Sequence, residues 1–216
     1  IVGFVGATWS RELTCLLLEW IPNGSMGDLL ISPRVSLDWG EPLLKLATDV
    51  ARGMAYMHSR NFINEVTGQR QERVIHRDLK PENVLITDWR GAKISDFGTS
   101  RTVSTEAEMT IVGTPLYAAP EVMRGEFYSE AVDVYGFGMM LASMAVRKQG
   151  IVNFISEQWQ LSFSQPSAPD PNSIAFRRVL RALWDDGWRA FSLENALPGT
   201  PSTISDLASL CCAQNP

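Results

Sequence analysis

Three short motifs in this sequence contain side chains of the types that carry chemistry. They read His-Arg-Asp-Leu-Lys-Pro-Glu-Asn at 76–83, Asp-Phe-Gly at 96–98 and Ala-Pro-Glu at 119–121. The carboxylate of Asp78 can accept a proton, and Lys80 places a compact positive charge two residues further on. The oxygens of Asn83 and Asp96 are of the kind that Mg²⁺ prefers over nitrogen or sulfur. These residue types therefore suit proton transfer beside a bound magnesium ion.

A strand and a long helix are expected before the first motif. The apolar run at 13–21, closed by Pro-Asn-Gly, predicts a buried strand that ends in a turn. Asp38 and Glu41 offer a capping-box start to a helix that runs to about His58. Apolar residues recur along this helix at helical spacing, at Leu43, Ala47, Val50, Met54 and Met57. Residues 61–73 are polar and aperiodic, which predicts a surface loop.

The stretch that joins the first two motifs predicts a hairpin. Apolar triplets at 84–86 and 92–94 flank a turn-forming Asp-Trp-Arg-Gly segment at 88–91. Beyond the second motif, the sequence from 99 to 114 is rich in hydroxyl groups and has no apolar period, as expected of a mobile loop. The first two motifs are thus predicted to flank a hairpin, and a loop leads on toward the third.

Helices are expected after the third motif. The mostly apolar stretch from 129 to 146 predicts a buried helix, whose two glycines each cost about 1 kcal/mol relative to Ala and indicate close packing against backbone. Residues 147–174 are rich in Pro, Ser and Gln and are predicted to form a linker. An amphipathic helix over 176–184 and a last helix from about Ser202 complete the expected elements.

Length and composition are those of one globular domain without a membrane span. The 216 residues include 45% hydrophobic and 20% charged positions, and the longest uncharged apolar runs are too short to cross a bilayer. The net charge of −5 opposes a broad nucleic-acid-binding surface, which needs clustered Lys and Arg. Three cysteines are too few for a disulfide framework or a four-ligand zinc site, and they are expected to be buried thiols in a reducing, cytoplasmic compartment.

In this order, and with a helix, a hairpin and a loop around them, the three motifs resemble the signature of eukaryotic protein kinases. The resemblance covers residues 1–216 and implies an α+β, protein-kinase-like fold with a mainly helical large lobe. It makes residues 1–21 the last strands of the small lobe with the hinge, and residues 22–216 the large lobe. A partial domain is expected, because the family's Gly-rich loop, strand lysine and partner glutamate come before this point and its large lobe continues further.

The family resemblance assigns a part in ATP-dependent phosphoryl transfer to five residues. Asp78 is expected to accept the proton of the substrate hydroxyl, and Lys80 to reach the transferring phosphate. Asn83 and Asp96 are expected to bind Mg²⁺. Thr114 is expected to bond both Asp78 and Lys80. These roles imply ATP, Mg²⁺ and a protein substrate as the molecules that the site takes.

The resemblance also extends to a nucleotide pocket. Leu18 stands in the gatekeeper position, and the hinge follows at Glu19 to Ile21. Backbone groups of Glu19 and Ile21 are expected to hold the adenine ring. Ser25 would lie near the ribose and Leu85 would form the floor under adenine. The alternative for these last two is that Ser25 is simply a turn residue and Leu85 simply a core residue.

Several segments resemble serine/threonine kinases more than tyrosine kinases. The motifs that carry this resemblance are Lys-Pro-Glu at 80–82 and Gly-Thr-Pro at 113–115. Residues 133–138 and 187–189 look most like the tyrosine-kinase-like group of serine/threonine kinases. Asp133 resembles the family carboxylate that accepts hydrogen bonds from the backbone of the catalytic loop. A serine/threonine kinase with a signalling role is expected; the alternatives are a pseudokinase that serves as a binding scaffold and a tyrosine-specific kinase.

Three features depart from the family pattern. The small-lobe parts that come earlier in the family cover and neutralise the ATP phosphates, so residues 1–216 alone are expected to transfer phosphate poorly. Glu121 is expected to lack the arginine with which the family pairs it. Residues 62–73 look like an insertion and are expected to be a surface excursion without effect on the chemistry, with a docking role left open.

The loop before the third motif is expected to carry a regulatory phosphate. Arg77 has no part in the chemistry, and Arg101 resembles a second family position aimed at the same spot. A phosphate on Thr110, four residues before Thr114, would pair with both arginines and order the loop. Thr105 is the next candidate, and plain solvated hydroxyls are the alternative. The sequence leaves open the oligomeric state, the neighbouring domains and any membrane attachment of the parent protein.

Overall fold

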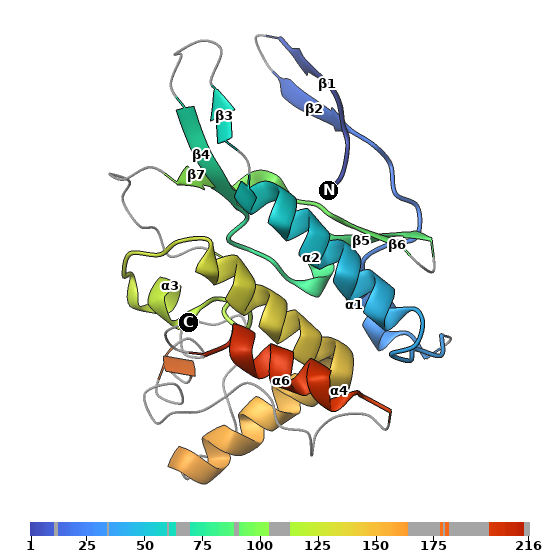
Figure 1. The fold of residues 1–216 in the computed structure, drawn as a ribbon, viewed down its shortest axis with the longest axis vertical. Coiled ribbons are helices and arrows are strands. Elements are labelled where there is room, and N and C mark those ends of the chain that lie inside the picture. Colours follow the sequence, from blue (N-terminus) through green and yellow to red (C-terminus); the bar gives the residue numbers. More distant parts are fainter. Residues whose placement is uncertain are drawn as a thin grey trace.

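The computed structural model describes residues 1–10, 13–33, 35–59, 61–63, 70–88, 91–103, 113–163, 178, 180, 181 and 199–213 of the chain. These residues form helices and small antiparallel sheets, which confirms the predicted α+β class. The strands before residue 76 lie at one end of the molecule, the helices Ala131–Phe163 and Ser202–Cys211 pack together at the other, and the strands Val84–Asp88 and Gly91–Ile94 lie between them (Figure 1). The predicted division into small-lobe strands with the hinge at 1–21 and a large lobe at 22–216 stays a prediction.

The described strands pair in three sheets. The strands are β1 Phe4–Trp9, β2 Thr14–Leu18, β3 Asn61–Ile63, β4 Arg70–Ile75, β5 Val84–Asp88, β6 Gly91–Ile94 and β7 Arg101–Val103. β1 pairs with β2, β5 pairs with β6, and β4 lies between β3 and β7. The helices are α1 Met26–Ile31, α2 Leu43–Ser59, α3 Pro120–Arg124, α4 Ala131–Phe163 and α6 Ser202–Cys211. Two short 3₁₀ turns cover Pro81–Asn83 and Phe97–Thr99.

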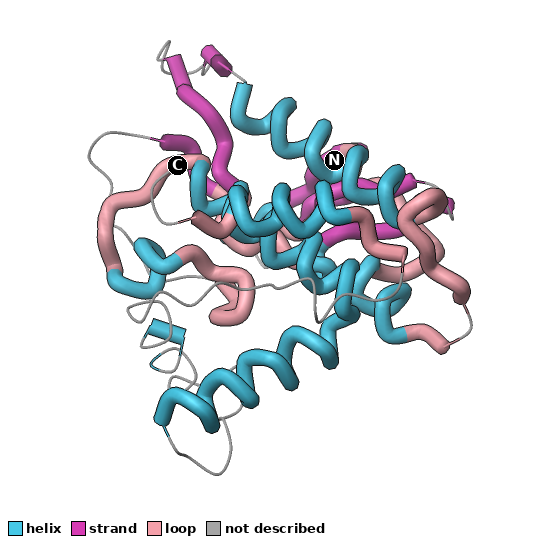
Figure 2. The backbone as a smooth tube through the Cα atoms, turned by 60° about the horizontal axis from the view of Figure 1, so that its bottom comes forward, coloured by secondary structure: helices cyan, strands magenta, loops and turns pink. Residues whose placement is uncertain are grey.

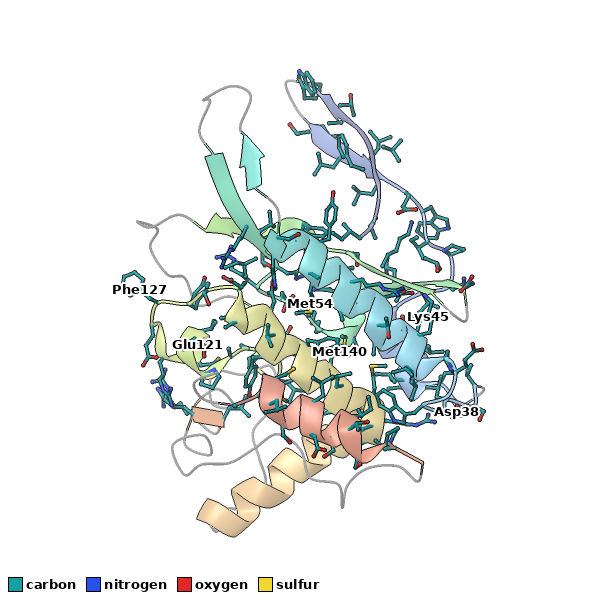
Figure 3. The ribbon with its side chains drawn as sticks, viewed as in Figure 1. Asp38, Lys45, Met54, Glu121, Phe127 and Met140 are labelled. Atoms are coloured by element: carbon teal, nitrogen blue, oxygen red, sulfur yellow. The ribbon has the colours of Figure 1, made fainter. Side chains whose placement is uncertain are left out.

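The core lies between α2, α4 and the β5–β6 hairpin. The predicted apolar face of α2 is buried, and Met54 of α2 and Met140 of α4 lie where the two helices meet (Figure 3). A Cβ atom on Gly138 of α4 would lie 2.7 Å from Sγ of Cys212, and one on Gly136 would lie 2.9 Å from the carbonyl oxygen of Leu79. The expected close packing at both glycines is thus confirmed.

The hairpin and the last helix are confirmed, but α2 begins later than predicted. β5 pairs with β6 in the register Val84↔Ile94 and Leu85↔Lys93. The Asp38 carboxylate accepts from the amide of Glu41 at 3.0 Å, which closes a turn, and the helix starts only at Leu43. The capping-box pattern therefore marked a turn that precedes the helix.

Two predicted loops contain strands. The surface loop predicted at 61–73 is wrong at both ends, because β3 and β4 pair there as a hairpin. The mobile loop predicted from 99 to 114 is wrong at its start, because β7 pairs with the other edge of β4. Polar composition misled the prediction, since backbone ladders form without an apolar period when a neighbouring strand is present. Residues 64–69 and 104–112 lie outside the described part of the chain.

The linker predicted at 147–174 is wrong over residues 148–163, which continue α4. At Arg147 the helix has a non-helical residue with φ 63° and ψ 159°, and the guanidinium donates to the carbonyl of Leu30 at 3.3 Å. Beyond this kink the helix runs in a clearly different direction from its first part (Figures 1 and 2). Of the predicted helix at 176–184, residues 178, 180 and 181 are helical and the others lie outside the described residues.

The strand predicted at 13–21 is present, but its predicted burial is wrong. Leu16 is 69% exposed and Leu17 is 48% exposed. β1 and β2 form a sheet of two strands, and no third strand of the described chain joins them. A two-stranded ribbon cannot cover both of its own faces, so apolar residues on β2 remain exposed. No helix in the described part of the chain is both long and apolar enough to cross a membrane.

Candidate active site

A buried carboxylate at the start of α4 holds the loop that carries the first motif. Asp133 is 1% exposed and accepts hydrogen bonds from the amides of His76 at 2.8 Å and Arg77 at 2.9 Å. The ring Nε2 of His58, at the end of α2, lies 2.9 Å from the same carboxylate. This is the scaffolding contact expected for Asp133, and it fixes the backbone immediately before Asp78.

Backbone strain is concentrated at the same place. Arg77 has φ 68°, in the left-handed region that costs a non-glycine residue about 1–3 kcal/mol. Gly113 has φ 91°, and a Cβ atom there would lie 2.7 Å from the carbonyl oxygen of Arg77. The hydrogen bonds to Asp133 offset this strain. The close approach of Gly113 then brings Thr114, the next residue, beside Asp78.

Asp78 is at the centre of four donors from three neighbouring residues. Its Oδ1 accepts from the amide of Thr114 at 2.9 Å and from the Thr114 hydroxyl at 3.1 Å. Its Oδ2 accepts from Nδ2 of Asn83 at 3.0 Å and lies 2.8 Å from Nζ of Lys80. Lys80 also donates to the Thr114 hydroxyl at 2.7 Å. The structure therefore brings Asp78, Lys80, Asn83 and Thr114 together, and the expected bonds from Thr114 to both partners are present.

Asp96 is attached to this cluster through Ser95. The carbonyl of Asn83 accepts from the amide of Ser95 at 2.8 Å and from its hydroxyl at 3.0 Å. Asp96 itself is exposed, has φ 58° and accepts from the amide of Gly98 at 3.3 Å. The ring of Phe97 meets the ring of His76 edge-on at 5.1 Å. The second motif is therefore packed against the first.

The donor set fits a hard divalent cation. Nδ2 of Asn83 is used on Asp78, which leaves the amide oxygen for another partner, and the carboxylate of Asp96 is open to solvent. Within the described residues no group of three or more His, Cys, Asp or Glu side chains could hold an ion. A cation here would therefore depend on Asn83, Asp96 and oxygens of a bound phosphate, the mixture that Mg²⁺ commonly uses.

The hinge residues follow β2 and are tied to β6. The Glu19 carboxylate accepts from Nζ of Lys93 at 2.7 and 2.8 Å, and the amide of Gly3 also donates to it. The Lys93 ammonium, and next the Gly3 amide, hold the pKa of the Glu19 carboxyl below its usual range. In the described chain neither the carbonyl of Glu19 nor the amide of Ile21 bonds to another backbone group. Leu18 ends β2 immediately before them, and the adenine-binding role expected of these residues stays a prediction.

Ser25 and Leu85 are brought side by side by a β-bridge. The amide of Ile86 donates to the carbonyl of Gly24 at 3.0 Å, which joins the segment after the hinge to β5. Ser25 is also the N-cap of α1, because its hydroxyl accepts from the amide of Asp28 at 3.1 Å. Ser25 thus has a structural role as the cap of α1, whereas the alternative had named it a turn residue, and its place near a ribose stays a prediction. The sequence analysis missed this cap, although Ser-x-x-Asp before an apolar pair signals it.

Arg77 has neutral partners among the described residues. Its Nε donates to the carbonyl of Thr99 at 2.5 Å, and Nη1 donates to the Tyr128 hydroxyl at 3.2 Å. The sequence analysis missed Tyr128 and His58, since their partners are distant in the chain and no local pattern marks them. Thr105 and Thr110, and the side chain of Arg101, lie outside the described part of the structure.

Glu121 lies in α3, and Figure 3 labels it there together with Phe127. It lines a cavity of about 480 Å³ together with Phe127 and Leu210, both of which are largely exposed. None of the ion pairs among the described residues involves Glu121. That Glu121 lacks the arginine with which the family pairs it stays a prediction.

Comparison with known proteins agrees with this geometry. The family model described as "Protein kinase domain" matches residues 1–216. The chain is 34% identical over 195 residues to "Probable serine/threonine-protein kinase drkC" of Dictyostelium discoideum, covering 86% of this chain and 24% of that protein. It is 37% identical over 147 residues to "Probable serine/threonine-protein kinase drkD" of the same organism, covering 68% of this chain and 11% of that protein.

A viral protein is similar to a comparable extent. "Putative serine/threonine-protein kinase/receptor R826" of Acanthamoeba polyphaga mimivirus is 30% identical over 187 residues, which cover 85% of this chain and 11% of that protein. The chain therefore spans about a tenth to a quarter of the length of these relatives.

Proposed function

This chain belongs to the protein kinase family and is of the serine/threonine type, and from that premise we propose that the protein containing it phosphorylates serine and threonine side chains of protein substrates with ATP. The observation that supports this most directly is the Asp78 carboxylate, which lies among Lys80, Asn83 and Thr114. A proton acceptor, a positive charge and an oxygen ligand for a metal thus meet at one point, as phosphoryl transfer requires.

Asp78 is the proposed proton acceptor. Each of its oxygens already receives two donors, so a substrate hydroxyl has to replace one of them, and the Thr114 hydroxyl at 3.1 Å is the longest of the four contacts. The hydroxyl oxygen forms its bond to the γ-phosphorus while the bond to the leaving ADP oxygen breaks, and Asp78 takes the proton. Lys80 stabilises the negative charge on the transferring group.

Asn83 and Asp96 are the proposed ligands of Mg²⁺. The ion, when bound, neutralises charge on the β- and γ-phosphate oxygens. Asn83 performs a second task, because its amide nitrogen orients both the backbone carbonyl and the carboxylate of Asp78. A residue that serves both the metal and the base couples the position of the phosphate to that of the proton acceptor.

The proposed adenine site is the hinge. The backbone carbonyl of Glu19 and the amide of Ile21 offer one acceptor and one donor to the edge of the ring. Leu18 would bound the pocket behind it, Leu85 would lie under the ring and Ser25 near the ribose. The ion pair between Glu19 and Lys93 supports this assignment, because it anchors the hinge to β6 without using those backbone groups.

The test is an Asp78→Asn substitution in the protein that contains this domain. The change is nearly isosteric and removes the proton acceptor, so kcat should fall by about 10²- to 10⁴-fold while ATP binding and folding are retained. Asp206→Asn is the matched control, because Asp206 is exposed on α6. Phosphoamino-acid analysis should show phosphoserine and phosphothreonine. Undiminished kcat in Asp78→Asn would remove the assigned role, phosphotyrosine alone would favour a tyrosine kinase, and ATP binding without transfer by the wild-type protein would favour a pseudokinase.

Phosphorylation of Thr110 is the proposed activating event. It is supported by Arg77, whose guanidinium has neutral partners among the described residues and would gain from a phosphate of about −1.5 to −2 charge. Mass spectrometry of the active protein should find this phosphate, and Thr110→Ala should lower kcat more than Thr105→Ala. An active enzyme without phosphate on residue 110 would refute the proposal.

ATP and a protein substrate are the proposed partners, and the cytoplasm is the proposed location. The three cysteines are free thiols, which suits a reducing compartment where ATP is available. A green-fluorescent fusion of the whole protein, observed with and without a membrane marker, would test this location. A net charge of −5 gives no support to nucleic-acid binding.

A further inference from the structure

The described ends of the segment that resembled an insertion belong to two strands, β3 and β4, of a three-stranded sheet. β3 pairs with β4 in the register Asn61↔Glu72, Phe62↔Gln71 and Ile63↔Arg70. The other edge of β4 pairs with β7, from Glu72↔Val103 to Ile75↔Arg101. β4 is therefore the central strand, with β3 on one side and β7 on the other (Figure 1).

This sheet joins the two motifs of the active site. β4 ends at Ile75, and the next residue, His76, begins the loop that carries Asp78. β7 begins at Arg101, five residues after Asp96. The position of Asp96 relative to Asp78 is thus constrained from one side by the pairing of β4 with β7.

A further contact fixes β4 to the helix that holds the catalytic loop. The register shifts between Glu72 and Val74, and Arg73 lies at this irregularity with φ 26°. Its side chain forms an ion pair with Glu130, which precedes Asp133 by three residues. Asp133 in turn binds the amides of His76 and Arg77. β4 is therefore anchored near the start of α4 through Glu130, and the loop that follows β4 is anchored there through Asp133.

We propose that the β3 strand is a positioning element for the metal-binding motif, because it turns a two-stranded pairing of β4 and β7 into a three-stranded sheet. An isolated two-stranded ribbon is marginal in water, whereas a third strand gives the central strand partners on both edges. The strand Asn61–Ile63 is thus more than a surface excursion: it supports β4, and β4 in turn holds Arg101–Val103, which follows Asp96. This role deepens the proposed function and rests on it.

The first test needs no catalytic activity. Asn61 and Glu72 are cross-strand partners, so residues 62–71 can be replaced by Asn-Gly, a two-residue hairpin turn. Hydrogen exchange in the amides of residues 101–103 should then speed up by about fivefold or more, the factor expected from losing roughly one hydrogen bond of support. In the matched control only residues 64–69 are replaced by Asn-Gly, which joins the partners Ile63 and Arg70 and keeps the β3–β4 ladder. The control should exchange as the wild type does.

The second test is kinetic. In the active protein the first variant should lower kcat and weaken the apparent binding of Mg²⁺, measured by titrating the metal at saturating ATP, while the control should do neither. If the variant without residues 62–71 unfolds, hydrogen exchange will be fast throughout α2 and α4. The double substitution Phe62→Pro and Ile63→Pro then takes its place, because it removes amide donors of β3 and leaves the chain length unchanged.

The two hypotheses fail differently. Unchanged exchange at residues 101–103 in a folded variant without β3 would overturn the positioning role even if Asp78→Asn abolishes activity. Faster exchange in the control as well would also overturn it, because β3 is intact there. An inactive wild-type protein would refute the proposed function, whatever the exchange rates.

Discussion

Replacing Asp133 by asparagine should loosen the catalytic loop, and the structure sets the magnitude. One carboxylate oxygen accepts from the amide of His76 at 2.8 Å and faces Nε2 of His58 at 2.9 Å, and the other accepts from the amide of Arg77 at 2.9 Å. An asparagine offers one acceptor oxygen and one NH₂ group. In either orientation the NH₂ group faces at least one backbone donor, so a buried hydrogen bond is lost and a donor is left unsatisfied.

The loss of one buried hydrogen bond sets the expected change in the free energy of unfolding. A buried donor without a partner costs about 1–3 kcal/mol, so Asp133→Asn should lower the free energy of unfolding by that amount. Asp133→Ala removes all three contacts and should cost about 3–5 kcal/mol, a large part of the 5–15 kcal/mol that holds a domain folded. Because Arg77 is already strained at φ 68°, the loss should appear first at residues 76–78.

Urea denaturation of the wild type, Asp133→Asn and Asp133→Ala would measure these costs. Hydrogen exchange at the amides of His76 and Arg77 would locate them. Glu130→Gln is the control, because its ion pair with Arg73 is partly exposed and such pairs contribute about 0–1 kcal/mol. If Asp133→Asn changed the free energy of unfolding by less than the control does, or left exchange at both amides unchanged, the scaffolding role of Asp133 would be refuted.

Two further predictions concern stability. Gly138→Ala should destabilise the chain by about 1–2 kcal/mol in urea denaturation, since the new Cβ would lie 2.7 Å from Cβ of Cys211 and from Sγ of Cys212. Gly6→Ala is the control and should cost less than about 0.5 kcal/mol, because nothing lies within 4 Å of a Cβ atom there. Equal costs for the two substitutions would contradict the packing argument. Burial raises the pKa of Tyr117, so the folded state keeps a proton that the unfolded chain loses above about pH 10, and stability should fall as the pH rises from there. Tyr117→Phe should flatten this fall, and an equally steep loss in the variant would show that other groups cause it.

Local elements were predictable where their cause is local. The apolar spacing of Leu43 to Met57 and the triplets of the β5–β6 hairpin identified those elements, because the repeat of a helix or strand is written in neighbouring residues. The short strands β3 and β7 escaped prediction, since each pairs with a strand from another segment and three residues carry no local period. The helix beyond Arg147 also escaped, because its composition resembled a linker.

The sequence by itself determined which chemical groups this protein has and in what order they occur. The first two motifs named Asp78, Lys80, Asn83 and Asp96, the Gly-Thr-Pro segment at 113–115 named Thr114, and the comparisons confirmed the family. Tertiary structure decided how those groups meet: Thr114 reaches Asp78 across 36 residues, and Asp133 holds the amide of Arg77 across 56. Such contacts depend on how α4 packs against α2, which no local spacing encodes. The buried Asp133 and its three partners are the physical reason that a flexible loop becomes a site of fixed geometry.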